Sequence, residues 1–268
     1  MKLNRVLIVY KKIGIHSPKR LTRISRLHMQ AVERAKRDLK ALGIRCQVLE
    51  RGKLKRNQKA DLIISIGGDG TFLACAHVAN SAPLLGLNSM PGYSIGFFCA
   101  ATTETLSKTV VKIQMDRLKL RYIPLIEAKI GKKAIPCLAL NDILFAGDSP
   151  AEMARYTMEI GKKSERQRSS GVWISSGAGS TAAILSAGGK RQNMESTKIQ
   201  YLVREPFKMP GRRYSMLRGI LRGSDRIKVT SNMRDARVYI DGPKLVYPVK
   251  EGETLTAYAS KKTLRIFL

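Results

Sequence analysis

The stretch that constrains the fold most is Leu62–Thr71, with the sequence LIISIGGDGT. It opens with a short apolar run rich in Ile, Leu62–Ile66, which is typical of a strand buried in a sheet. The glycines that follow allow a sharp turn and a close approach of the backbone to a ligand, and we expect Phe72–Ala79 to form a helix. Asp69 then lies where a strand ends and a helix begins, the place where open α/β sheets bind ligands and phosphates. A carboxylate that only capped the helix would not require three glycines around it.

The first third of the chain alternates strands with helices. Apolar runs predict further strands at Arg5–Tyr10, Arg45–Leu49 and Leu84–Leu87. A long basic helix is expected over about residues 20–42, ended by Gly43 as a C′ glycine. Its inward-facing side chains are predicted to include Leu27, Ala31, Ala35 and Leu42. Strands separated by helices pair in parallel, so we predict an α/β domain with a doubly wound sheet over residues 1–116.

The pattern changes after about residue 116. Short apolar runs spaced by Gly, Pro, Asn and Asp predict a β-rich domain over residues 117–268. The last strand is also a candidate to return to the first domain. The predicted strands are Leu118–Ile123, Leu125–Ile130, Ala134–Leu140, Ile143–Ala146, Tyr156–Ile160, Val172–Ser175, Arg226–Val229, Arg237–Ile240, Thr254–Ala259 and Leu264–Phe267.

Composition excludes several classes of protein. The four cysteines are widely spaced and the three histidines form no cluster with acids, which argues against zinc hydrolysis and a Ser-His-Asp triad. We expect reduced thiols in a cytoplasmic protein, because the sequence shows no signal peptide and no apolar run long enough to span a membrane. The net charge of +29 arises from 49 basic and 20 acidic residues. A nucleic-acid partner is disfavoured, because no stacking motif or zinc finger accompanies this charge.

A second glycine-rich string, Ser175–Ala183, again follows an apolar strand. We expect a helix over Ala182–Leu185, capped by Ser180 or Thr181. Its free N–H groups and hydroxyls suit a polar or anionic ligand, although a capped helix behind a flexible turn explains the same residues. Asn141-Asp142 and Asp241-Gly242-Pro243 are, by themselves, typical of turns.

Together and in this order, these strings resemble the NAD kinase family. The resemblance covers about residues 60–245 and rests on GGDGT at 67–71, LGLNSMPGYSIGFF at 85–98, ND at 141–142, GSTAA and SAGG within 179–189, and DGP at 241–243. It implies an α/β domain joined to a β-rich dinucleotide-binding domain. It also implies transfer of the ATP γ-phosphate, with Mg²⁺ as cofactor, to the 2′-hydroxyl of the adenosine ribose of NAD, by a homodimer or homotetramer.

The resemblance also implies roles for individual residues. Asp69 matches the carboxylate that acts on the 2′-hydroxyl, as a base or as a metal contact, and no metal ligand is assigned. Phosphate and nucleotide binding are expected at Gly67, Gly68, Gly70, Thr71 and Phe97. NAD binding is expected at Asn141, Asp142, Ala178, Thr181, Ala182 and Ser186.

The sequence departs from the family pattern on the side that recognises the acceptor. Ser170 stands where the family has an acid, Ser176-Gly177 where it has Thr-Pro, Ala183 where it has Tyr, and Asp142 where it has Glu. The Ser-Ser-Gly variant is similar to a divergent branch that includes mitochondrial-type NAD kinases. NADH, another nucleotide, a sugar or a lipid therefore stays open as acceptor, and so does a binding protein without catalysis. Lipid kinases and phosphofructokinase share GGDG strings, but their downstream signatures are missing.

Overall fold

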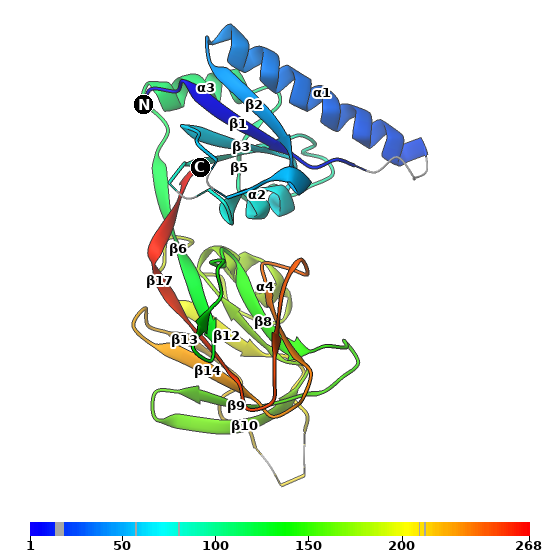
Figure 1. Cartoon of the computed structure of the whole chain (residues 1–268), viewed down its shortest axis with the longest axis vertical. Coiled ribbons are helices and arrows are strands. Elements are labelled where there is room, and N and C mark those ends of the chain that lie inside the picture. The colour runs from blue at the N-terminus through cyan, green and yellow to red at the C-terminus, as the bar shows by residue number, and fades with distance from the viewer. Residues whose placement is uncertain (14–18, 57, 80, 209, 212) are drawn as a thin grey trace. The chain divides into compact units, whose positions relative to one another are not determined.

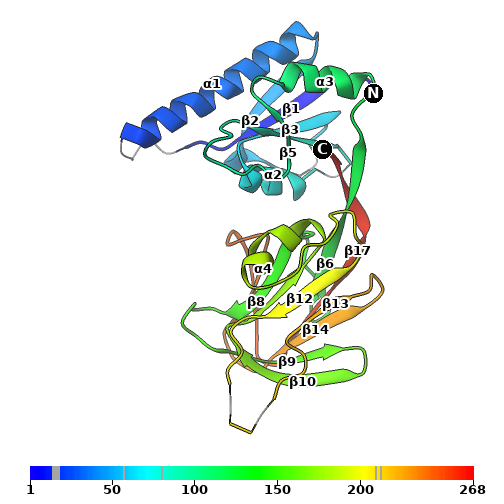
Figure 2. The same ribbon diagram turned by 180° about the vertical axis from the view of Figure 1, so that it is seen from behind.

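The computed structural model describes residues 1–268 apart from 14–18, 57, 80, 209 and 212, and apart from the side chains of residues 19–22. The chain forms two compact units, Met1–Tyr122 with Leu264–Leu268, and Ile123–Thr263. Figures 1 and 2 show both units from opposite sides.

A parallel sheet forms the centre of the first unit. Its strands lie in the order β2 (Arg45–Glu50), β1 (Arg5–Tyr10), β3 (Leu62–Ile66) and β4 (Leu84–Asn88). Two further strands pair in parallel with β4, on its side away from β3. They are β5 (Cys99–Thr102) and the end of β17 (Thr254–Phe267). Helices α1 (Lys19–Ala41) and α3 (Leu106–Gln114) cover one face and α2 (Asp69–Ala76) covers the other (Figures 1 and 2). The sheet is therefore doubly wound, as predicted.

Burial explains this arrangement. All five residues of β3 are buried, which requires cover on both faces of the strand. Ala31 and Ala35 of α1 are buried against the sheet, whereas Leu27 is 40% exposed, so its predicted inward position is wrong. Gly43 has φ +71° and ends α1, and the next residue, Ile44, donates its N–H to the Leu39 carbonyl at 2.9 Å. This pattern is a Schellman motif, in which glycine carries no steric penalty.

The second unit is built from two antiparallel sheets. One contains β10 (Lys163–Ser169), β9 (Ala154–Ile160), β14 (Arg226–Ser231) and the first part of β17, with β6 (Leu120–Ile130) and β7 (Lys133–Ala134) beside it. The other has the order β13 (Arg218–Leu221), β12 (Ile199–Val203), β11 (Val172–Ser175), β8 (Asp142–Gly147), β15 (Ala236–Ile240) and β16 (Leu245–Val249). Two short helical segments, η2 (Ala178–Thr181) and α4 (Ala183–Ser186), follow β11. The prediction of a β-rich second part is confirmed.

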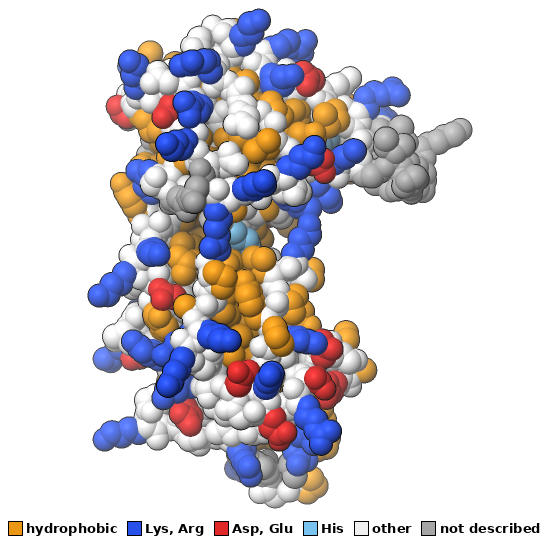
Figure 3. All heavy atoms as spheres, viewed as in Figure 1, with side chains coloured by type: hydrophobic (Ala, Val, Ile, Leu, Met, Phe, Trp, Pro, Cys, Tyr) orange, Lys and Arg blue, Asp and Glu red, His pale blue; other side chains and the backbone are white. Residues whose placement is uncertain are grey.

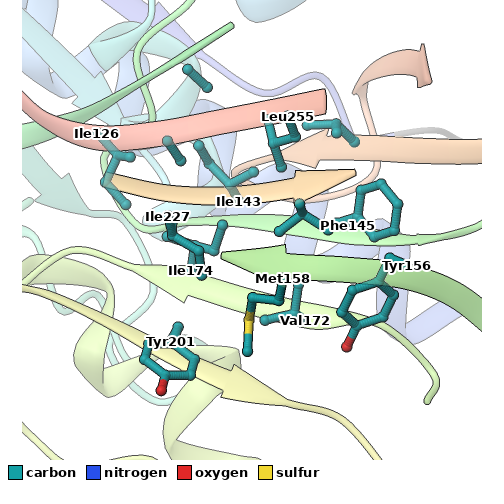
Figure 4. Close-up of a cluster of buried hydrophobic side chains, with 14 of the residues drawn as sticks. Ile126, Ile143, Phe145, Tyr156, Met158, Val172, Ile174, Tyr201, Ile227 and Leu255 are labelled. Carbon is teal, nitrogen blue, oxygen red and sulfur yellow. The ribbon is translucent and has the colours of Figure 1, made fainter. Parts of the chain in front are cut away.

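Lys and Arg side chains are scattered over the face of the molecule seen in Figure 3, in both units, with Asp and Glu side chains fewer among them. Inside the second unit, the core lies between its two sheets. Figure 4 shows Ile143 and Phe145 of β8 and Val172 and Ile174 of β11 among its members, all of them fully buried. Alternate residues of each strand point inward, which is the two-residue period of a sheet with one buried face. A buried polar pair completes the core, because the Tyr156 hydroxyl lies 2.8 Å from Ser169 Oγ.

Several elements differ from those expected. The runs at 118–123 and 125–130 form the single strand β6, and the two last predicted strands form the single strand β17. Of the strand predicted at 134–140, only Ala134 belongs to a strand and Ala139 to an isolated bridge. Helix α2 begins at Asp69 instead of Phe72. The strands and the α-helix that were not predicted are β5, α3, β10, β12, β13 and β16, and neither 3-10 helix, η1 (Arg51–Lys53) or η2, was predicted.

Candidate active site

The glycine turn after β3 places Asp69 at the start of α2. Gly67 has φ +139°, and a Cβ built on it would lie 3.0 Å from Thr71 Oγ1. Gly68 is the N-cap residue with an extended backbone, and its carbonyl accepts the N–H of the buried Thr71 at 2.9 Å. Only glycine combines the backbone angle and the lack of space at position 67. Gly70, the next residue of the helix, is exposed.

The Asp69 carboxylate is held by two backbone N–H groups of the loop that follows β4. Phe97 N–H donates to Oδ2 at 3.1 Å, and Phe98 N–H donates to Oδ1 at 3.0 Å. The side chain is half-buried. Each carboxylate oxygen accepts more than one hydrogen bond, so the two amides fix the orientation of the group and leave acceptor positions open to a ligand.

Three aromatic rings support this arrangement. The rings of Phe72, in α2, and Phe98 are stacked with centroids 4.9 Å apart and an interplanar angle of 9°. The Phe97 ring meets Phe98 edge-on at 5.2 Å and is 37% exposed. Offset-stacked and edge-on aromatic pairs add stability beyond the area that they bury. Phe97, which was predicted to bind nucleotide, holds Asp69 through its backbone amide.

Asn88, the last residue of β4, organises the same loop and was not predicted. Its Oδ1 accepts the Met90 N–H at 3.0 Å and the Ser94 hydroxyl at 2.9 Å, and its Nδ2 donates to the Ser94 carbonyl at 3.0 Å. Gly96 has φ +62°, and a Cβ on it would lie 2.6 Å from Asn88 Nδ2. The signal in the sequence is an Asn directly after an apolar strand and before a glycine-rich loop.

In the second unit, Asp241 organises the start of β8. It has φ +48°, and its carboxylate accepts the N–H groups of Leu140 at 2.8 Å, Asn141 at 2.7 Å and Asp142 at 3.0 Å. Its own N–H donates to the Asp142 carbonyl at 3.0 Å. The interpretation of Asp241-Gly242-Pro243 as a turn missed this role. A carboxylate that closes an apolar strand is the only signal that the sequence offers.

The second glycine-rich string packs against the same strand start. Ser176 Oγ donates to the Leu140 carbonyl and accepts the Gly179 N–H, the latter at 3.0 Å. The Ser176 N–H donates to the Asn141 carbonyl at 2.9 Å. A Cβ on Gly179 would lie 1.9 Å from the backbone carbonyl oxygen of Asn141, so this position excludes any side chain. The structure thus brings together Asn141, Asp142 and the segment from Ser176 to Gly179.

The other predicted residues of this string differ in exposure. Ala178 is 1% exposed, Thr181 and Ala182 are half-buried, and Ser186 is exposed at the end of α4. Capping of the helix by Ser180 or Thr181 is wrong, because Ala182 occupies the N-cap position and no side chain caps α4. Ser180 instead donates its hydroxyl to the Gly177 carbonyl at 2.7 Å and accepts the Gln192 N–H at 2.9 Å.

The Asp142 carboxyl has an unusual charge state. It is 5% exposed, and burial together with the neighbouring Asp241 carboxylate raises its pKa to about 7. Near neutral pH it therefore keeps a proton in a large share of the molecules and can donate a hydrogen bond. The side-chain oxygen of Asn141 is buried and makes no hydrogen bond with the described residues. The pair offers one donor and one acceptor to a ligand.

Ser170 lies apart from this cluster within the second unit. It lines a cavity of about 350 Å³ together with Trp173, Arg204 and Tyr239. The Arg204 guanidinium lies 5.7 Å from the centre of the Trp173 ring, and its Nη1 donates to the Ser170 carbonyl at 3.4 Å. Asp142 pairs with Ser175 at the far end of β11. Within one unit, the structure therefore does not bring Ser170 to Asn141.

In the described part of the chain, no group of three or more His, Cys, Asp or Glu side chains has an arrangement that would hold a metal ion. No helix among the described residues is both long and apolar enough to cross a bilayer.

Known proteins are similar to this chain in sequence and in fold. Residues 5–116 match the model of the ATP-NAD kinase N-terminal domain. The chain is 30% identical over 267 residues to an NADH kinase of Arabidopsis thaliana, with 91% of this chain and 84% of that protein covered. It is 28% identical over 316 residues to a probable NADH kinase of Oryza sativa subsp. japonica, covering 100% of this chain and 97% of that protein. A crystal structure of an NAD kinase from Archaeoglobus fulgidus in complex with ATP has the same fold, with a TM-score of 0.72, 22% identity, and 98% and 93% of the two chains covered.

These likenesses extend over both units, and they define the class of the protein as a phosphotransferase with an α/β unit and a β-rich unit. The chain belongs to the NAD kinase family.

Proposed function

We propose that this protein transfers the γ-phosphate of ATP to the 2′-hydroxyl of the adenosine ribose of NAD and so makes NADP. The observation that carries the proposal is the Asp69 carboxylate, which two loop amides hold at 3.1 and 3.0 Å at the end of a buried parallel strand. A sugar hydroxyl is a weak nucleophile, and a fixed carboxylate accepts its proton as the attack on phosphorus proceeds.

Phosphoryl transfer otherwise depends on alignment and on neutralising charge. In the proposed mechanism the N–H groups of Gly68, Asp69 and Gly70 bind phosphate oxygens, since the start of a helix favours anions. The N–H groups at the two ends of the turn are already used, Gly67 by the Leu87 carbonyl and Thr71 by the Gly68 carbonyl. Mg²⁺ is commonly held by one or two carboxylates together with substrate phosphates, and Asp69 with the ATP phosphates fits that donor set.

The acceptor is assigned to the second unit. Asp142 keeps a proton in a large share of the molecules near neutral pH, and the side-chain oxygen of Asn141 makes no hydrogen bond with the described residues. The two groups suit the hydroxyls and amide-like groups of a dinucleotide. The backbone from Ser176 to Gly179 lies against Asn141, and Gly179 leaves no room for a side chain there. These contacts support a dinucleotide subsite at Asn141, Asp142, Ala178, Thr181 and Ala182.

NADH is the second candidate acceptor. The oxidised nicotinamide ring carries a positive charge, and the reduced ring is neutral. Ser170, where the family pattern has an acid, removes a negative charge that would favour the oxidised ring. The two plant relatives that cover most of the chain are described as NADH kinases, which also favours this candidate.

The test is formation of NADP or NADPH by the purified protein with ATP and Mg²⁺, using NAD and NADH in parallel and Asp69→Asn beside the wild type. We expect turnover with the wild type and a loss of about 100- to 10,000-fold in the variant, the usual range for a lost general base. A folded Asp69→Asn protein with wild-type turnover would remove Asp69 from the mechanism. A folded wild-type protein that phosphorylates neither dinucleotide would refute both NAD and NADH as acceptors.

A further inference from the structure

His28, in α1, is buried beneath the glycine turn. Its side chain is 2% exposed, and a Cβ built on Gly67 would lie 3.8 Å from His28 Cε1. The ring also approaches Tyr10 at the end of β1, with centroids 6.4 Å apart. Burial of an imidazole costs free energy, because its two nitrogens lose their hydrogen bonds to water.

One nitrogen of the ring links α1 to the loop after β4. His28 Nδ1 lies 2.8 Å from Ser89 Oγ. Ser89 follows Asn88, whose side chain binds Met90 and Ser94 of the same loop. The loop ends at Phe97 and Phe98, the residues whose amides hold Asp69. A continuous set of hydrogen bonds and chain connections therefore runs from His28 to the carboxylate.

The surroundings favour the neutral ring. Burial lowers the pKa of His28, and the charge of Lys11 acts in the same direction, while the Lys11 carbonyl opposes them. His28 Nε2 makes no well-formed hydrogen bond with the described residues. The Ser89 hydroxyl can either donate to or accept from Nδ1, so the link to Ser89 suits an uncharged imidazole.

We propose that His28 is a positioning residue for Asp69, acting through Ser89 and the loop of residues 89–98. The link holds the near end of that loop, so that the Phe97 and Phe98 amides stay within hydrogen-bond distance of the carboxylate. The consequence for catalysis rests on the proposed function, whereas the effect on the loop does not.

The chemistry of His28 offers a matched pair of variants. An Asn side chain places its amide near the position of Nδ1, and a Gln side chain places it near Nε2. We expect His28→Asn to keep the Ser89 link, and His28→Gln and Ser89→Ala to lose it. Gln30→Ala, an exposed position of the same helix, is the control.

The first readout is hydrogen exchange at the Phe97 and Phe98 amides, which needs no activity. We expect exchange to be at least fivefold faster in Ser89→Ala and His28→Gln than in the wild type, His28→Asn and Gln30→Ala. The second readout is kinetic: displacement of a reacting group by about 1 Å costs up to about 100-fold, so kcat should fall about 10- to 100-fold in the first two variants, with the KM for ATP nearly unchanged.

Unchanged amide exchange in folded Ser89→Ala and His28→Gln would overturn the proposal, whether or not the protein is active. Equal losses in His28→Asn and His28→Gln would also overturn it, because the effect would then not depend on Nδ1. A wild-type protein without kinase activity but with the expected exchange pattern would refute the proposed function and leave the link from His28 to the loop established.

Discussion

Asp142 is the residue whose behaviour depends most on its surroundings. The ordinary pKa of such a carboxyl is 3.8, and burial beside Asp241 raises it to about 7 in the folded protein. Between these values the folded chain binds a proton that the unfolded chain has lost. The contribution of Asp142 to stability is therefore fully present below about pH 4 and is lost as the pH rises to about 7.

Asp142→Asn should remove this dependence, because an amide does not titrate. We expect the free energy of unfolding of the variant, relative to the wild type, to improve by on the order of 3 kcal/mol between about pH 4 and pH 8. Urea unfolding of both proteins at the two pH values measures the difference. Parallel pH profiles of wild type and variant would mean that Asp142 ionises as an ordinary surface carboxylate.

At the scale of elements, the close contact between η2 and Asn141, the residue that precedes β8, depends on one glycine. A Cβ on Gly179 would lie 1.9 Å from the backbone carbonyl oxygen of Asn141 and 2.5 Å from its Cα, so the Asn141 backbone would have to move. Gly52 is the matched position, since its φ is not positive and a Cβ there would meet only the end of the Glu50 side chain at 3.8 Å.

We expect Gly179→Ala to destabilise the protein by about 1–3 kcal/mol, as overpacking of a close-packed interior does. Gly52→Ala should change stability by less than about 0.5 kcal/mol. Because the Asn141 backbone must shift, Gly179→Ala should also raise the Kd for NAD. Thermal unfolding and calorimetric titration with NAD test both points, and equal stability of the two variants would contradict the close contact.

The elements that could be predicted from the sequence are those whose side chains report burial directly. β3 and β11 were predicted with the observed ends because their apolar residues lie in one short run. β10, with the sequence KSERQRS, has no such run, since only Gln167 and Ser169 point inward. Helix α2 starts three residues early because a turn rich in glycine hides the first helical residue.

The candidate site shows the same limit. The motifs indicated Asp69 and Asn141 as site residues. They did not indicate the groups that hold these two residues, such as the Phe98 amide and the Asp241 carboxylate. Asp241 acts across about 100 residues of chain by binding backbone N–H groups, and no local pattern indicates such a contact. His28 was seen only as an isolated histidine, because its partner, Ser89, is 61 residues away.

At the scale of the whole molecule, the net charge of +29 is the dominant feature. Lys and Arg side chains are spread over the face in Figure 3 rather than gathered on one element. Ion pairs such as Arg237 with Asp148, at 2.7 Å, balance only a part of this charge. Like charges that remain unbalanced repel one another and disfavour the compact state.

This repulsion predicts that salt stabilises the protein. At about 0.1 M salt the Debye length is about 10 Å, so repulsion between distant surface charges is largely screened. We expect Tm to rise by about 2–5 °C between about 20 mM and 300 mM NaCl, which corresponds to about 1 kcal/mol for a chain of this size. Sodium sulfate at equal ionic strength serves as the control, because a specific phosphate site would add stability at low millimolar sulfate. A Tm that falls with NaCl would mean that the surface ion pairs outweigh the repulsion. The excess positive charge would then not destabilise the folded state.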